Sequence, residues 1–118
     1  MANTNYPSEI VLHKQSKQLE LAYGDDRYML SAEYLRVYSP SAEVRGHGHG
    51  QEVLQTNKEQ VAITQIEPTG NYAIKIYFDD GHDSGLFSWD YLYELATQQD
   101  QHWQDYLNRL EAAGYQRH

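Results

Sequence analysis

The clearest pattern in the chain is the alternation over residues 72–78, which predicts a strand with one core face made by Tyr72, Ile74, Ile76 and Phe78. Asp79-Asp80-Gly81 follows as a predicted turn, because aspartate tolerates turn geometry and glycine accepts positive φ. Residues 85–88 then fit a returning strand, so the two segments predict a β-hairpin.

Helices are predicted after this hairpin. Ser88 stands at an N-cap position, and Asp90 in the first turn suits the positive end of the helix dipole. Apolar residues at helical spacing follow at Trp89, Leu92, Tyr93 and Ala96, and again at Trp103, Leu107 and Leu110. The pattern therefore predicts helical segments over 89–113, as one bent helix or two, with Asp100 as a cap if there are two.

The N-terminal half predicts further strands and one short helix. Residues 10–12 and 19–23 alternate on either side of a polar connection, and 27–30 form a third strand after a turn. Ser31 is a second N-cap, for a helix near 31–38 that a proline ends. Residues 61–67 form another predicted strand, whose irregular apolar spacing predicts a β-bulge.

Together these elements predict an α+β fold with a small antiparallel sheet of about five to six strands. The short helix near 31–38 and the helical region 89–113 would pack against that sheet. A length of 118 residues matches one domain, 1–118, with a core over 8–97 and a C-terminal helical extension. Most of the eleven tyrosines are expected in the core, where each ring is buried and its hydroxyl finds a partner.

Composition narrows the function classes. The chain has no cysteine, which excludes disulfides, thiolate metal sites and cysteine nucleophiles, and fits a cytoplasmic location. Nine basic and seventeen acidic residues give a net charge of −8, which opposes nucleic-acid binding. No apolar run approaches the roughly 20 residues of a membrane span, so we expect no membrane partner.

Histidines mark the first candidate site. His47 and His49 lie in a glycine-rich stretch that predicts a loop, and His82 lies in the acidic turn. Three imidazoles brought together would bind zinc or iron. Carboxylates that would complete such a site belong to Asp79, Asp80 and Asp83. The alternative is that the two loop histidines are exposed to solvent and that His82 hydrogen-bonds within its turn.

Catalysis and protein binding are the other two candidates. His82 beside an aspartate would move a proton, but no nucleophile with an oxyanion-forming motif accompanies it, and Ser88 is explained as a cap. Aromatic side chains rimmed by aspartates would receive another protein. This predicted partner surface comprises Asp79, Asp80, Asp83, Tyr77, Phe87 and Tyr91. Burial of the aromatic residues in the core is the alternative.

Three segments carry a resemblance to a known family: residues 34–43 (YLRVYSPSAE), 66–73 (IEPTGNYA) and 78–92 (FDDGHDSGLFSWDYL). They resemble the gamma-butyrobetaine hydroxylase-like N-terminal domain family, over roughly residues 8–97. In those hydroxylases the domain precedes an oxygenase domain that depends on 2-oxoglutarate and iron, and 118 residues leave no room for it. The resemblance therefore implies a non-catalytic form without the oxygenase domain.

The resemblance also implies a structural zinc site, which the family's eukaryotic hydroxylases build from three cysteines and a histidine. On this sequence the histidine falls at His82 and the cysteines fall near Ser39, Ser41 and Val44. Serine is a poor zinc ligand and valine is none, so His47 or His49 would have to replace them. Similar domains occur alone in bacteria and at the end of Mrp-type ATPases of iron–sulfur assembly, which implies an accessory, protein-binding role.

We therefore expect a non-catalytic binding or adaptor protein, with another protein as its partner and a link to metal or iron–sulfur metabolism. The first alternative is a metal-binding protein that holds zinc or iron with His82, His47 and His49. The second alternative is a stand-alone enzyme.

Overall fold

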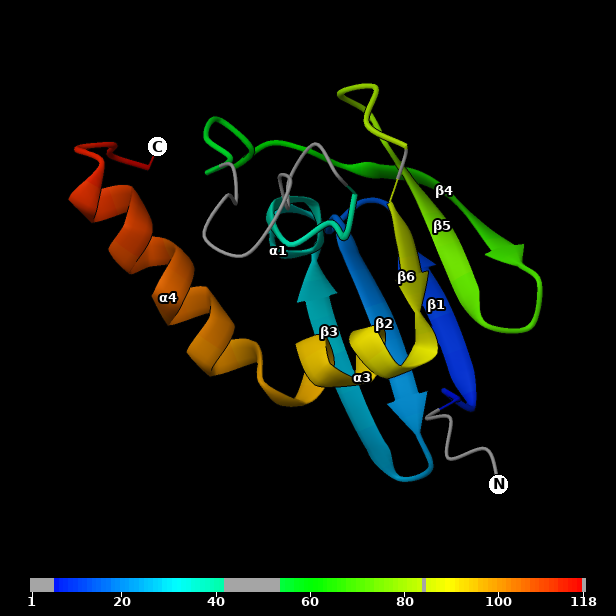
Figure 1. The fold of residues 1–118 in the computed structure, drawn as a ribbon. Helices are drawn as coiled ribbons and strands as arrows, with labels where there is room; N and C mark the ends of the chain where they lie inside the picture. Colours follow the sequence, from blue (N-terminus) through cyan, green and yellow to red (C-terminus); the bar gives the residue numbers. More distant parts are fainter. Residues whose placement is uncertain (1–5, 42–53, 84, 118) are drawn as a thin grey trace.

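The computed structural model describes residues 6–41, 54–83 and 85–117, and the predicted metal ligands His47 and His49 lie outside these ranges. The α+β class is confirmed, and the strands of the described ranges form two three-stranded antiparallel sheets (Figure 1). The elements are β1 (Glu9–His13), β2 (Gln18–Tyr23), β3 (Asp26–Ser31), α1 (Ala32–Val37), β4 (Ile63–Thr69), β5 (Ala73–Phe78), β6 (Leu86–Ser88), α3 (Trp89–Thr97) and α4 (Gln99–Ala112). Within the described ranges no helix has the length and apolarity to cross a bilayer.

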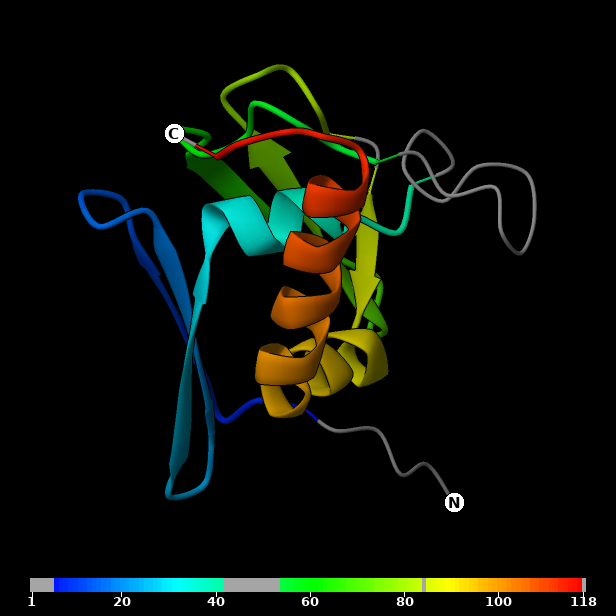
Figure 2. The ribbon, with the colours of Figure 1, turned by 90° about the vertical axis from the view of Figure 1, so that its left-hand side faces the viewer.

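The first sheet has the order β1-β2-β3, and the helices lie on one side of it (Figure 2). Leu19 lies opposite Leu12 on one neighbour and opposite Leu30 on the other, so the inner face is a continuous apolar row. The outer face carries ion pairs instead, in which Arg27 contacts both Glu9 and Glu20. This sheet therefore follows the alternation that the sequence predicts.

The second sheet has the order β4-β5-β6, and its strands confirm the predicted hairpin. Ile74 of β5 lies opposite Phe87 of β6, and both side chains are fully buried. The predicted β-bulge in β4 is also confirmed, because the register with β5 shifts between Ile63 and Gln65. The bulge absorbs one residue and keeps the apolar side chains of β4 and β5 on the same face.

Both predicted serine caps are confirmed. The Ser31 hydroxyl accepts a hydrogen bond from the Tyr34 N–H at 3.0 Å, and the Ser88 hydroxyl accepts one from the Tyr91 N–H at 3.1 Å. The C-terminal region is two helices, and Gln98 between them provides no side-chain cap for α4. Asp100 lies in the first turn of α4 and is not its cap.

The core contains several tyrosines whose hydroxyls bind backbone carbonyls far away in the sequence. The Tyr34 hydroxyl donates to the Leu95 carbonyl at 2.8 Å, and the Tyr106 hydroxyl donates to the Gln55 carbonyl at 2.6 Å. Both tyrosine rings are 1% exposed. The first bond joins α1 to α3, and the second joins α4 to the segment before β4. Other groups hold the turn after β5.

Candidate functional site

The turn after β5 positions His82. Gly81 has φ of +89°, a conformation that glycine adopts without strain, and it lets the chain reverse within four residues. The Phe78 N–H donates to the His82 carbonyl at 3.0 Å. Asp79 pairs with Ala62 by two hydrogen bonds, of 2.9 and 3.0 Å, which fix the turn to the segment before β4. The backbone of His82 is therefore held on a rigid support.

The His82 side chain meets two serines that follow α1. Its Nε2 lies 2.8 Å from Ser39 Oγ and 3.3 Å from Ser41 Oγ, and the two hydroxyl oxygens are 3.4 Å apart. Ser39 is 1% exposed, Ser41 5% and His82 9%. We call these three residues the serine–histidine cluster. They are three of the four positions that the resemblance implies for a metal centre, and the fourth, Val44, lies outside the described residues. Apolar periodicity alone carries no signal for this contact.

Asp80 forms a second cluster beside the first. Its Oδ2 accepts hydrogen bonds from Arg36 Nε at 2.9 Å and from Lys58 Nζ at 2.7 Å, and its Oδ1 accepts the His82 N–H at 3.1 Å. Burial raises the pKa of Asp80, but the bonds from Lys58 and the His82 backbone and the charge of Arg36 outweigh burial and lower it to about 2. Asp80 is therefore ionised and already paired.

The described residues do not fit a zinc or iron site. Around His82 they offer one imidazole and two hydroxyls, and neutral hydroxyls are poor ligands for either metal. Nowhere in the described ranges do three histidine, aspartate or glutamate side chains gather as metal ligands would. The use of His82 with His47 and His49 stays a prediction, because the two loop histidines lie outside the described residues.

A serine oxygen 2.8 Å from an imidazole nitrogen has the spacing of a nucleophile and its base. A nucleophile must meet substrate, and only 1% of Ser39 is exposed. The same cluster is better explained as a buried polar contact that satisfies its own hydrogen bonds. The geometry therefore supports a structural role for the serine–histidine cluster more directly than a catalytic role.

The residues of the predicted partner surface differ in their exposure. Phe87 is fully buried in the core, so its assignment to a surface was wrong: β6 turns its side chain inward opposite Ile74. Tyr91 is half-buried, and its hydroxyl donates to the Tyr38 carbonyl. Asp79 and Asp83 are exposed, and Tyr77 is half-buried on the outer face of β5.

An exposed aromatic cluster lies at the other end of β5. It comprises Tyr6, Tyr72 and Trp89, of which Tyr6 is 55% and Tyr72 57% exposed. The Tyr6 hydroxyl and the Trp89 indole N–H both donate to the Asn71 carbonyl, at 2.8 and 2.9 Å, and their rings lie 5.6 Å apart. The alternation predicts Tyr72 on the core face. Tyr72 instead precedes β5 and belongs to the turn, which leaves its ring in solvent.

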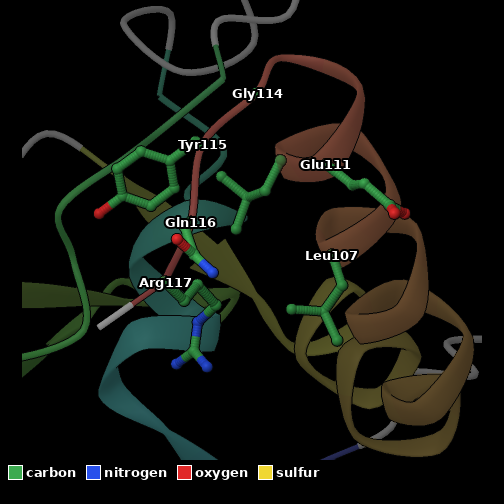
Figure 3. Close-up of a pocket in the computed structure, with 7 residues that line it drawn as sticks. Leu107, Glu111, Gly114, Tyr115, Gln116 and Arg117 are labelled. Carbon is green, nitrogen blue, oxygen red and sulfur yellow. The ribbon is translucent and has the colours of Figure 1, made fainter.

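A cavity of about 550 Å³ lies between the end of α4 and the C-terminal segment (Figure 3). Its lining residues are Leu107, Leu110, Glu111, Gly114, Tyr115, Gln116 and Arg117. The Tyr115 hydroxyl is bonded to Asn57 and Glu59, and the Arg117 guanidinium is paired with Glu33. The Tyr115 hydroxyl and the Arg117 guanidinium in this lining are therefore already engaged by other parts of the fold.

Comparison with known proteins places the chain in a family. Residues 10–93 match the model of the gamma-butyrobetaine hydroxylase-like N-terminal family. Two proteins with NMR solution structures are similar over nearly the whole chain. The first is 60% identical, with a TM-score of 0.86 over 98% of this chain and 91% of its own. The second is 49% identical, with a TM-score of 0.81 over 99% and 88%.

A third solved structure is a crystal structure of a protein of unknown function from Acidithiobacillus ferrooxidans ATCC 23270, assigned to the DUF971 family. It is 31% identical, with a TM-score of 0.65 over 81% of this chain and 98% of its own. No curated protein matches the sequence. The family match covers both sheets, α1 and the start of α3, and the resemblance seen in the sequence is confirmed: this chain belongs to the gamma-butyrobetaine hydroxylase-like N-terminal family.

Proposed function

We propose that this chain is a non-catalytic protein-binding module whose contact surface is the exposed aromatic cluster. The observation that carries the proposal is that Tyr6 and Tyr72 are more than half exposed, while hydrogen bonds to the Asn71 carbonyl fix the rings of Tyr6 and Trp89. Aromatic rings that are already positioned lose little conformational entropy on binding, and tyrosine and tryptophan dominate the energetics of protein interfaces.

The charge of the molecule supports a partner that presents basic and apolar side chains. The chain carries a net charge of −8. Asp90, which follows Trp89 in the sequence, is exposed to solvent. An acidic surface around an aromatic patch attracts lysine and arginine and repels the phosphates of nucleic acid. We therefore place the function in protein binding and not in nucleic-acid binding.

The biological setting is part of the same proposal. The resemblance to domains at the end of Mrp-type ATPases favours a partner in metal or iron–sulfur metabolism. A cysteine-free chain fits a reducing compartment, so we place the complex in the cytoplasm, which cell fractionation tests.

Site-specific crosslinking tests the contact surface. A photoreactive phenylalanine analogue at position 72 is expected to crosslink one protein in native lysate, which is then identified, purified and titrated against the unmodified chain. The double change Tyr6→Ser with Tyr72→Ser should weaken that measured affinity by at least about tenfold, as for an interface hot spot. The fold is checked by circular dichroism.

Met29→Ser is the matched control, because Met29 is another large apolar residue, 39% exposed, on the other sheet. It should leave the affinity unchanged. Equal affinities for the original chain and the double tyrosine variant would refute this surface. A turnover activity of the purified chain would refute the non-catalytic role.

A further inference from the structure

The serine–histidine cluster is assembled in the way that metal centres are assembled. Three side chains from two segments about 40 residues apart converge on one point, and each residue is at most 9% exposed. Burying polar atoms in this way is costly unless each one finds a partner. Here the partners are the cluster members themselves, because Ser39, Ser41 and His82 bind one another.

The size of the triangle distinguishes a hydrogen-bonded cluster from a metal site. A tetrahedral zinc ion with nitrogen and oxygen ligands at about 2.0 to 2.2 Å holds its ligand atoms roughly 3.3 to 3.6 Å apart. The three observed distances are 2.8, 3.3 and 3.4 Å. Hydrogen bonds account for these lengths, and an ion held by the same three atoms would have to push Ser39 Oγ and His82 Nε2 apart.

Both sides of the cluster are also held by contacts outside the three hydrogen bonds that join its members. The backbone of His82 is held by Asp80 and Phe78, at 3.1 and 3.0 Å. On the serine side, Gly85 packs against Ser39 so closely that a Cβ at position 85 would lie 2.3 Å from Ser39 Oγ. The positions of residues 39 and 82 are therefore supported by contacts other than the hydrogen bonds within the cluster.

We propose that Ser39, Ser41 and His82 form a metal-free replacement for a metal centre, in which hydrogen bonds fasten the segment after α1 to the turn after β5. The chain then folds to full stability without a metal ion at His82. Because the three positions already converge, thiols at positions 39 and 41 are enough to make a centre that binds a soft or borderline divalent metal.

Two measurements on the unmodified, untagged chain test the first half. Melting temperatures with a chelator, and with added zinc or ferrous iron, should be equal within error, since a ligand of the native state would raise the melting temperature. Elemental analysis should find no metal whose amount depends on His82, as judged against His82→Ala. A melting temperature that falls with chelator, or stoichiometric metal that His82→Ala removes, would overturn the proposal.

The double variant Ser39→Cys with Ser41→Cys tests the second half. Cobalt is the probe, because thiolate ligation gives an intense charge-transfer absorption, and we expect one cobalt per chain together with a rise in melting temperature. Adding His82→Ala to the double variant should weaken cobalt binding at least about tenfold. A double variant that is folded by circular dichroism yet lacks the charge-transfer band would overturn the inferred geometry.

If the double variant does not fold, the single change Ser41→Cys keeps the question open to measurement. The thiol at position 41 and the His82 imidazole would then bind cobalt as a pair, with an affinity that His82→Ala lowers. No difference between these two variants would count against the convergence of positions 41 and 82. All of these outcomes are independent of the proposed docking at Tyr6 and Tyr72.

Discussion

Asp80 links three segments that are distant in the sequence. Its carboxylate accepts hydrogen bonds from Arg36 at the end of α1, from Lys58 before β4 and from the backbone of His82. Arg36 is 7% exposed, so its guanidinium depends on this carboxylate and on Gln55 for partners. The Asp80 carboxylate thus supplies the negative charge that compensates the nearly buried Arg36 guanidinium.

Asp80→Asn should lower the free energy of unfolding at pH 7 by about 2 kcal/mol, because the amide leaves the Arg36 charge uncompensated. The pKa of Asp80 is depressed from 3.8 to about 2 in the folded chain. Its stabilisation is therefore fully present above about pH 4 and is lost as the pH falls toward 2. Urea unfolding of both proteins between pH 7 and pH 2 checks this, and parallel pH profiles would contradict it.

Gly85→Ala should destabilise the fold by about 1 to 3 kcal/mol, because the new methyl group would lie 2.3 Å from Ser39 Oγ. The cost should shrink in a Ser39→Ala background, which removes the oxygen that the methyl group meets. Thermal unfolding of the four proteins in this double-mutant cycle measures the coupling. Additive losses would show that the methyl group clashes elsewhere.

At the residue scale the sequence predicted part of this site. The family motif placed His82 opposite Ser39 and Ser41, and the structure brings the three together. The roles of Asp80 and Tyr72 were not predictable, because one depends on cations from two remote segments and the other on where a strand begins. Side-chain alternation carries no information about either.

At the scale of elements, serine caps define where two helices begin. Ser31→Ala and Ser88→Ala should each cost about 1 kcal/mol, since each leaves a first-turn N–H of α1 or α3 without its partner. Ser16→Ala in the exposed turn between β1 and β2 is the control and should change stability by less than about 0.5 kcal/mol. Chemical denaturation measures all three, and equal effects would contradict the caps.

The position of the break between α3 and α4 depends on tertiary packing that the local sequence does not report. Residues 97–100 contain neither glycine nor proline, yet the helix stops and restarts at Gln98. The restart gives α4 a direction in which Tyr106 and Leu110 pack against Val37 of α1. Tertiary packing outweighs the helical propensity of this stretch, and no pattern within it reports that packing. The division of the strands between two sheets has the same origin.

At the scale of the whole molecule, buried tyrosines limit stability at high pH. Burial raises the pKa of Tyr23 and of Tyr106 to about 12, and burial also raises the pKa of Tyr34. Stability from these groups is complete below about pH 10 and is lost as the pH rises through 12, because the unfolded chain ionises first. Tyrosinate absorbance should therefore rise together with unfolding. Independent ionisation of these tyrosines in the folded chain would contradict this.

The C-terminal segment is fastened to α1 by Arg117, whose guanidinium pairs with both carboxylate oxygens of Glu33. Glu33 is 7% exposed, so Arg117→Ala should cost about 2 kcal/mol by leaving a buried carboxylate unpaired. Arg27→Ala removes ion pairs on the exposed outer face of the first sheet, and its effect should be much smaller. Equal losses in urea unfolding would contradict the role of burial.

Within the described ranges, every strand pairs only with its neighbours in the sequence, in the orders β1-β2-β3 and β4-β5-β6. Each sheet can therefore close through short loops, which lowers the contact order and favours rapid folding. The contacts that join the two halves span far more of the chain, such as the bond from Tyr34 to Leu95 across 61 residues. We therefore expect docking of the two halves to be the slow step, and the groups that complete it should acquire protection from hydrogen exchange last.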